Sequence, residues 1–289
     1  MQTHETKGML LGFMGVLMFS LTLPFTRIAV AELNPYFVTF GRSSLGGLCA
    51  LLLFVFTKPQ RPTSSQLLRL SVMALGVVYG FPLFVSLAMT TLPSAHGGIV
   101  LGVLPLATAV VSALRFHERP SHMFWCSAVV GSLLVIIYAY INGSGGLVSE
   151  DGLLFLAVLS AAIGYSEGGK LSEDMSSVEV ISWALVLTLP LNLFLTYQCM
   201  DVDLRTVSTA ARVSFVYVGL ISMYVGFFFW YRGLALGGVA RVGQVQLLQP
   251  FLTLVGAYFL LDEAITAMNV GFALCVLAVV VLGKKTRAK

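Results

Sequence analysis

A short polar segment lies between two strongly apolar stretches near the carboxyl end of the sequence. Residues 232–250 read RGLALGGVARVGQVQLLQP. At about 100° per helical residue, Gln246, Gln249 and Thr253 share one stripe of a helix, whereas Gln244 belongs to a separate one. Amide groups cannot face lipid unsatisfied, so both stripes are expected to face protein or water. The glutamines either bond a neighbouring helix or line a substrate path, and we favour the path.

Two charged side chains fall inside apolar runs. Arg42 lies about two helical turns inside the second run. It either snorkels outward or holds a fixed positive charge against carbonyl groups or an anionic group. Glu167 lies late in the sixth run, within GYSEGGK. Its carboxylate either pairs with Lys170, three residues further on, or binds an amino group or carries a coupling proton. Both residues are candidates for the substrate path.

An internal match adds two tyrosines and two prolines. A shift of 145 residues aligns Tyr79 with Tyr224 and Pro105 with Pro250. The tyrosines are expected to face a cavity because their positions match in both halves. A proline inside a helix frees the carbonyl group four residues earlier, so Pro105 and Pro250 are hinge candidates, with a packing kink as the alternative. Trp230, near the end of the eighth run, is assigned to an interfacial aromatic belt.

Motifs for other kinds of chemistry are missing from the sequence. It contains no HExxH or Walker A motif, and no aspartate pair inside the apolar runs. The four cysteines lie in or beside different runs and form no CxxC pair. No catalytic residue, metal site or cofactor is therefore predicted. The basic residues are spread over short loops, which argues against a nucleic-acid surface.

The composition requires a lipid environment for the elements that carry these residues. Hydrophobic residues make up 57% of the 289 residues, charged residues 10%, and the mean hydropathy is +0.91. So few charges cannot cover a water-facing surface, so we expect an all-α integral membrane protein. Ten spans are predicted, at 9–27, 36–56, 69–90, 94–114, 122–141, 152–171, 178–198, 213–232, 239–261 and 266–283.

The distribution of basic residues predicts the orientation. If the amino terminus is cytoplasmic, 13 of the 17 lysines and arginines lie on the cytoplasmic side. Cytoplasmic loops carry an excess of lysine and arginine, so both termini are expected in the cytoplasm, with the protein in the plasma (inner) membrane. The first apolar run is expected to remain as a helix, because it is too long for a signal peptide.

The internal match divides the chain into two halves, residues 1–146 and 147–289. Each half has five expected helices, and an odd number turns the second half upside down relative to the first. Such inverted repeats are typical of secondary transporters. The shift also aligns Glu118 with Glu263, each just before a helix, where a carboxylate can bond free amides at the helix start.

The sequence resembles the drug/metabolite transporter superfamily, EamA type. The resemblance is carried by QVQLLQPFLTLVGAYFLLDEAIT, its echo GVLPLATAVVSALRFHERPS and the arginine of FVTFGRSSLGGL. It implies a central cavity lined mainly by the first, third, fourth, sixth, eighth and ninth helices, and it implies export of small metabolites. One departure is the first helix, where a tryptophan-glycine pair is common in the family and this chain has SLTLPF.

We therefore expect a secondary transporter that moves a small organic metabolite, as an exporter, by alternating access around a central cavity. No enzymatic activity is predicted. The alternatives are a membrane-embedded enzyme or a membrane assembly partner that transports nothing. The expected partners are the solute and the lipid bilayer, without nucleic acid. A coupling proton and the oligomeric state are left open.

Overall fold

The computed structural model describes residues 2–116, 122–142, 148–203, 205–237, 242–243 and 245–285. Every regular element in these ranges is helical, and the described residues form no strand. The elements are α1 (Gln2–Ser20), α2 (Thr22–Val30), α3 (Pro35–Thr57), α4 (Ser64–Ala74), η1 (Leu75–Gly80), α5 (Phe81–Ala88), α6 (Ser94–Val100), η2 (Leu101–Val103), α7 (Leu104–Phe116), α8 (His122–Asn142), α9 (Ser149–Asp174), α10 (Ser177–Gln198), α11 (Thr209–Val216), η3 (Tyr217–Val225), α12 (Gly226–Gly237), η4 (Val245–Leu248), α14 (Gln249–Leu261) and α15 (Ala267–Lys285).

The apolar helices make this an integral membrane protein, and each of the ten predicted runs overlaps one or more of them. Within the described ranges, 7 helices are long and apolar enough to cross a membrane. They are Thr6–Val30, Pro35–Thr57, Ser64–Ala88, Ser94–Phe116, Ser149–Asp174, Ser177–Gln198 and Thr209–Gly237. Three further apolar helices are shorter: Val129–Tyr138, Val245–Leu261 and Ala267–Val279.

Local sequence signals explain where the helices begin and end. The side chain of Asn34 accepts a hydrogen bond from the amide of Tyr36 at the start of α3, and Pro35 supplies a favourable first residue. The same helix ends where Lys58 takes a left-handed conformation, with φ of 44°. Thr63 and Gln66 form a capping box at the start of α4. These caps satisfy backbone groups that the helix itself leaves free.

The long helices are distorted at corresponding places. Two contain π-helical segments, η1 and η3, and two contain 3₁₀ segments, η2 and η4. Pro105 and Pro250 are the second residues of the α-helices that follow the 3₁₀ segments, as expected for residues that lack an amide donor. Tyr79 lies in η1 and Tyr224 in η3. Such irregular segments often occur at hinges and functional sites.

Close helix packing depends on small residues. Helix α1 packs along α12, and a Cβ on Gly233 would lie 2.7 Å from the backbone nitrogen of Gly12. Helix α9 packs along α4, η1 and α5, and a Cβ on Gly76 would lie 2.4 Å from the backbone oxygen of Ser160. Both contacts bring two backbones together in a way that only glycine permits, which is the usual basis of helix association in lipid.

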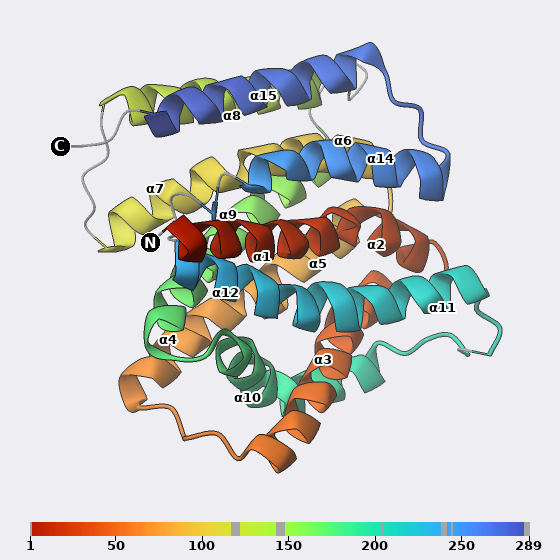
Figure 1. Cartoon of the computed structure of the whole chain (residues 1–289). Helices are drawn as coiled ribbons and strands as arrows, with labels where there is room; N and C mark the ends of the chain where they lie inside the picture. The colour runs from red at the N-terminus through yellow and green to blue at the C-terminus, as the bar shows by residue number, and fades with distance from the viewer. Residues whose placement is uncertain are drawn as a thin grey trace.

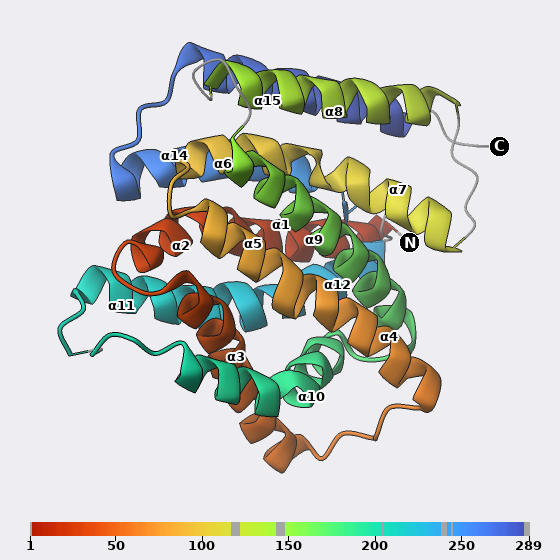
Figure 2. The same cartoon turned by 180° about the vertical axis from the view of Figure 1, so that it is seen from behind.

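The helices form one bundle with two distinct ends. Helix α3 packs against α10, α6 against α14, and α8 lies beside α15 along one side of the molecule (Figures 1 and 2). Helix α1 begins and α15 ends at the same end of the bundle, on the left in Figure 1. We call this the terminal end. Helix α6 begins and α14 ends at the opposite end.

Candidate functional site

A cavity, here called the vestibule, reaches the surface at the terminal end. Its volume is about 190 Å³. Its walls come from the whole length of α7, from the last turns of α9, from α12 and from the start of the ninth span. The lining combines aromatic rings, small hydroxyl groups and the charged side chains of Lys170 and Glu173. The lining residues are Pro105, Thr108, Ala109, Ser112, Phe116, Tyr165, Ser166, Lys170, Glu173, Trp230, Leu234, Gly243 and Gln246.

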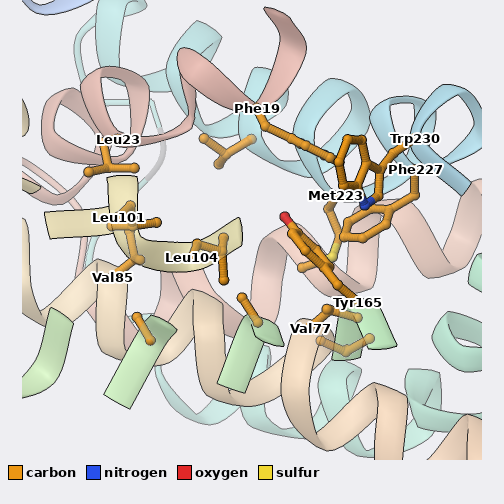
Figure 3. Close-up of a cluster of buried hydrophobic side chains, with 14 of the residues drawn as sticks. Phe19, Leu23, Val77, Val85, Leu101, Leu104, Tyr165, Met223, Phe227 and Trp230 are labelled. Atoms are coloured by element: carbon orange, nitrogen blue, oxygen red, sulfur yellow. The ribbon is translucent and has the colours of Figure 1, made fainter. Parts of the chain in front are cut away.

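A second, much smaller cavity lies deeper in the bundle, and we call it the inner pocket. Its free space is about 10 Å³, roughly enough for one water molecule. Tyr165 lines both cavities, so its ring stands between them. Figure 3 shows Tyr165 in a cluster with Phe227, Trp230 and Met223. The inner pocket is lined by Phe19, Thr22, Arg42, Val77, Phe81, Tyr165, Ser222, Met223, Phe227 and Gln249.

Arg42 is buried in the wall of the inner pocket, with 1% of its surface exposed. Its Nη2 donates a hydrogen bond to the hydroxyl of Ser222 at 2.9 Å, and that hydroxyl lies 2.7 Å from Thr22 Oγ1. Among the described residues, Nε and Nη1 of Arg42 have no acceptor. The snorkelling interpretation is therefore wrong, because the side chain points inward to polar groups of α2 and η3. A buried charge without an ionic partner is costly, by several kcal/mol.

A break in the first span creates part of this site. Pro24 has no backbone N–H to donate to the carbonyl oxygen of Ser20, so this helical hydrogen bond is missing, and α1 ends at Ser20. Thr253 Oγ1 donates to that freed carbonyl oxygen at 2.8 Å. Thr22, just beyond the break, turns its hydroxyl to Ser222. The segment SLTLPF thus contains a helix break, after which Thr22 contacts the same Ser222 hydroxyl that accepts a hydrogen bond from Arg42.

The two glutamines of the predicted stripe are both buried and line different cavities. Gln246 lines the vestibule and Gln249 lines the inner pocket. Within the described ranges, Gln246 Nε2 and Gln249 Oε1 lack a hydrogen-bond partner. Thr253, the third member, is used in packing against Ser20. Gln244 lies outside the described residues. A role of the glutamines in binding stays a prediction, which their unpaired polar atoms support.

The tyrosine pair lies elsewhere. Tyr224 is buried, with its hydroxyl 3.0 Å from Ser182 Oγ of α10. Tyr79 lies in η1 and is half-buried. Neither residue lines the vestibule or the inner pocket. A substrate contact by either tyrosine therefore stays a prediction that these two cavities do not support.

Glu167 is paired, although not with the expected residue. Its Oε2 accepts from Arg69 Nε at 2.9 Å and its Oε1 from Arg115 Nε at 2.7 Å. Lys170 instead pairs with Glu173, at 2.5 Å. The predicted pair of Glu167 and Lys170 is wrong, because Glu167 faces inward to α4 and α7 while Lys170 lies on the vestibule side. Two arginines distant in the sequence neutralise the buried carboxylate.

The opposite end of the bundle is held together by polar contacts. Glu263 accepts hydrogen bonds from the backbone amides of Ser94 and Ala95, at 2.8 and 2.7 Å, and lies 3.5 Å from Arg27 Nε. It therefore caps α6 and not the tenth span that follows it, whereas Glu118 lies outside the described residues. Close by, the buried side chain of His96 contacts Asp151, with Nε2 and Oδ1 2.7 Å apart. These contacts join the first, fourth and sixth spans to the end of the ninth.

The cavities also use residues that sequence reasoning assigned elsewhere or missed. Trp230 is 2% exposed and lines the vestibule, so its assignment to an interfacial belt is wrong. Ser222 and Thr22 were not predicted, because single hydroxyl residues in an apolar run give no periodic signal. The cavity walls come from the first, third, fourth, sixth, eighth and ninth spans, which the resemblance implied, and from Arg42 of the second.

Comparison with known proteins gives two matches to one family. The EamA-like transporter family matches residues 6–140 and again residues 148–283. An uncharacterized transporter, YdeK, of Bacillus subtilis (strain 168) is 44% identical over 277 residues, covering 94% of this chain and 96% of that protein. A probable amino-acid metabolite efflux pump of Salmonella typhimurium is 26% identical over 203 residues, covering 65% of this chain and 66% of that protein.

A solved crystal structure has the same fold. It aligns with a TM-score of 0.67 and 18% sequence identity, covering 95% of this chain and 98% of its own. An uncharacterized transporter of Archaeoglobus fulgidus is 25% identical over 222 residues. The family and the names of these relatives indicate a transporter rather than an enzyme. With both of its halves matched, the chain belongs to the EamA-like transporter family.

Proposed function

We propose that the protein is a secondary transporter that exports a small organic metabolite by alternating access between two inverted five-helix halves. The observation that carries this proposal is the contrast between the two ends of the bundle. The vestibule opens at the terminal end, while Glu263, His96 and their partners join helices at the opposite end. Such a cavity, open to one side only, is what one state of an alternating-access cycle requires.

Matched distortions support the two inverted halves. A shift of 145 residues takes Leu75 in η1 to residue 220 in η3, and Leu101–Val103 in η2 to 246–248 in η4. The packing is reciprocal as well: α1 packs along α12 as α9 packs along α4, η1 and α5. The two separate family matches, 6–140 and 148–283, agree with this division. Pro105 and Pro250 follow the 3₁₀ segments and would act as hinges.

The proposed export direction is supported by the predicted orientation and by the name of one relative. With both termini in the cytoplasm of an inner membrane, the vestibule faces the cytoplasm and is ready to take up a solute for export. The Salmonella typhimurium relative is named as an amino-acid metabolite efflux pump. Amino-acid metabolites are therefore the first class of solute to test.

Flux through proteoliposomes tests the proposal. Vesicles loaded with radiolabelled amino acids should exchange them for external unlabelled solute, and a pH gradient should accelerate net flux if a proton is coupled. Gln246→Ala and Gln249→Ala should reduce exchange by about tenfold, as expected when a buried hydrogen-bond group is removed from a site, while leaving the unliganded protein folded. Equal exchange by empty and protein-containing vesicles for every solute would overturn the proposal.

Cysteine labelling tests the orientation and the cavity together. Thr108→Cys in the vestibule should react with a membrane-impermeant reagent added from the cytoplasmic side, and a cysteine at position 142, in the junction between the halves, should react from outside. A junction that reacts from the cytoplasmic side would remove the inverted arrangement.

A further inference from the structure

The inner pocket carries a net positive charge. Arg42 is the one charged residue among those that line it, and the others are aromatic, aliphatic, hydroxyl or amide side chains. Among the described residues, no carboxylate contacts the guanidinium group, whose single side-chain bond goes to neutral Ser222. Resting on the function proposed above, we propose that Arg42 binds the carboxylate group of the transported solute.

One nitrogen of the guanidinium group is hydrogen-bonded, and the other two still have free N–H donors within the described part of the chain. Its Nη2 is tied to Ser222 Oγ, which in turn lies 2.7 Å from Thr22 Oγ1. This chain of hydroxyl groups fixes the side chain from α2 and η3. The Nε and Nη1 atoms, which together bear three N–H donors, have no acceptor in the described ranges. A carboxylate suits these donors, because its oxygens can accept charge-assisted hydrogen bonds from Nε or Nη1 and its charge neutralises the guanidinium group.

The neighbouring side chains narrow the class of ligand. A cationic solute would be repelled by Arg42. A phosphate dianion would be left with an unbalanced charge, because the inner pocket offers one cation. Gln249 contributes an amide whose Oε1 lacks a partner, so it can accept from an ammonium or hydroxyl group beside the carboxylate. The solute is therefore a carboxylate with one net negative charge or, with an amino group, a zwitterion.

The rest of the solute belongs in the vestibule. The inner pocket holds about one water molecule in this conformation, so a carboxylate can enter only if Tyr165 moves. Tyr165 lines both cavities, and its ring centroid lies 5.7 Å from that of Trp230 and 6.1 Å from that of Phe227. An apolar or aromatic remainder would pack against these rings, while Gln246, whose Nε2 has no partner among the described residues, is available for its polar groups.

Matched ligands that differ only in charge test this inference on the purified full chain. The probes are benzoate, 3-phenylpropionate, L-phenylalanine and L-leucine, each compared with its neutral or cationic amide, together with phenethylamine. Binding is followed by thermal shift, in which a ligand specific for the folded state raises the unfolding temperature. At least one carboxylate should stabilise the wild type, and its amide should bind about 100-fold more weakly.

Two variants connect that preference to the residue. Arg42→Gln should raise the Kd of the stabilising carboxylate about 100-fold, while the Kd of the corresponding amide ligand stays the same. Arg212→Gln is the matched control, because Arg212 is exposed and its Nη2 donates to the hydroxyl of Thr209, and it should leave the Kd unchanged. Ser222→Ala, which releases Nη2, should weaken binding about tenfold and serves as the second variant if Arg42→Gln fails to fold.

The inference is overturned if no carboxylate stabilises the wild type, if an amide or phenethylamine binds as tightly as its carboxylate, or if neither Arg42→Gln nor Ser222→Ala weakens binding. Transport is tested separately. Flux of phenethylamine that is unaffected in Arg42→Gln would leave the proposed transporter standing and remove the carboxylate. Tight carboxylate binding without any flux would support the binding role of Arg42 and would remove the proposed transport function.

Discussion

Two charged side chains, Arg42 and Glu167, are buried to the same extent, each with 1% of its surface exposed. Their surroundings differ sharply. Glu167 accepts charge-assisted hydrogen bonds from Arg69 and Arg115, one to each carboxylate oxygen. Arg42 contacts one neutral hydroxyl, and its Nε and Nη1 have no acceptor among the described residues. The charge of Glu167 has ionic partners within the protein, whereas the charge of Arg42 has none among the described residues.

The difference separates a structural charge from a binding charge. Removing one partner from a buried ion pair strongly destabilises a protein. A buried charge without an ionic partner keeps its desolvation penalty, so we expect its replacement by an apolar side chain to be neutral or stabilising. The ion group formed by Glu167, Arg69 and Arg115 joins α4, α7 and α9. Arg42 gains nothing comparable from its neighbours. An arginine buried despite this desolvation penalty indicates a role in binding a ligand that is absent from the empty protein.

The largest loss of stability is expected for Glu167→Gln. It replaces two charge-assisted hydrogen bonds, each contributing about 1.5 kcal/mol or more, so the free energy of unfolding should fall by about 3 kcal/mol. Denaturation in detergent measures this change. Glu173→Gln on the same helix is the control, since Glu173 is half-exposed. A loss below about 1 kcal/mol at Glu167 would show that its ion group is not structural.

Substitution of the two arginines should sharpen the assignment in order of burial. The Arg69 side chain is 22% exposed and that of Arg115 is 53% exposed. Arg69→Gln should therefore cost about 2 kcal/mol and Arg115→Gln about 1 kcal/mol, because water screens the more exposed pair. The same denaturation experiment compares them. The reverse order would mean that burial does not control the strength of this ion group.

The pair of Lys170 and Glu173 should contribute little. Its side chains are 46% and 50% exposed, although the distance between Nζ and Oε2 is short, at 2.5 Å. Lys170→Gln should change the free energy of unfolding by less than about 0.5 kcal/mol. A loss as large as that of Arg69→Gln would contradict the distinction between the buried and the exposed pair.

The smallest effect is expected outside the membrane, at Glu32. Hydrogen bonds from the side chain and amide of Ser208 lower the pKa of Glu32 below its usual value of 4.5. Its contribution to stability is therefore present above pH 4.5 and is lost as the pH falls through the lower, folded-state pKa. Glu32→Gln should slightly flatten the decline of unfolding temperature below pH 4.5 and leave neutral pH unaffected. A wild type with no such decline would contradict it.

The sequence predicted the helical elements well, for a physical reason. Each span must bury its backbone polar groups within itself, so length and hydropathy reveal it without any partner. The 3₁₀ segments before Pro105 and Pro250 were foreseeable as kinks, because proline acts on its own helix. The break at Leu21 was not predicted, although Pro24 lies three residues beyond it.

The partners of the buried charges could not be predicted from the sequence. Arg69 and Arg115 lie 98 and 52 residues from Glu167, and Ser222 lies 180 residues from Arg42. Only the packing of the helices decides such contacts, and Lys170 was the nearest base along the chain. Both glutamines were singled out because a polar stripe in lipid is visible locally. Tyr165 and Trp230 were missed as walls, since aromatic residues are equally common at membrane interfaces.

One pair of matched substitutions tests the difference between the two charges most directly. Arg42→Met and Glu167→Met each replace a buried charge by an apolar side chain, and both can be denatured in the same detergent without ligand. Arg42→Met should unfold at the wild-type free energy or up to about 4 kcal/mol higher, whereas Glu167→Met should lose about 3 kcal/mol or more. Equal losses in the two variants would make Arg42 as structural as Glu167 and would contradict the binding role.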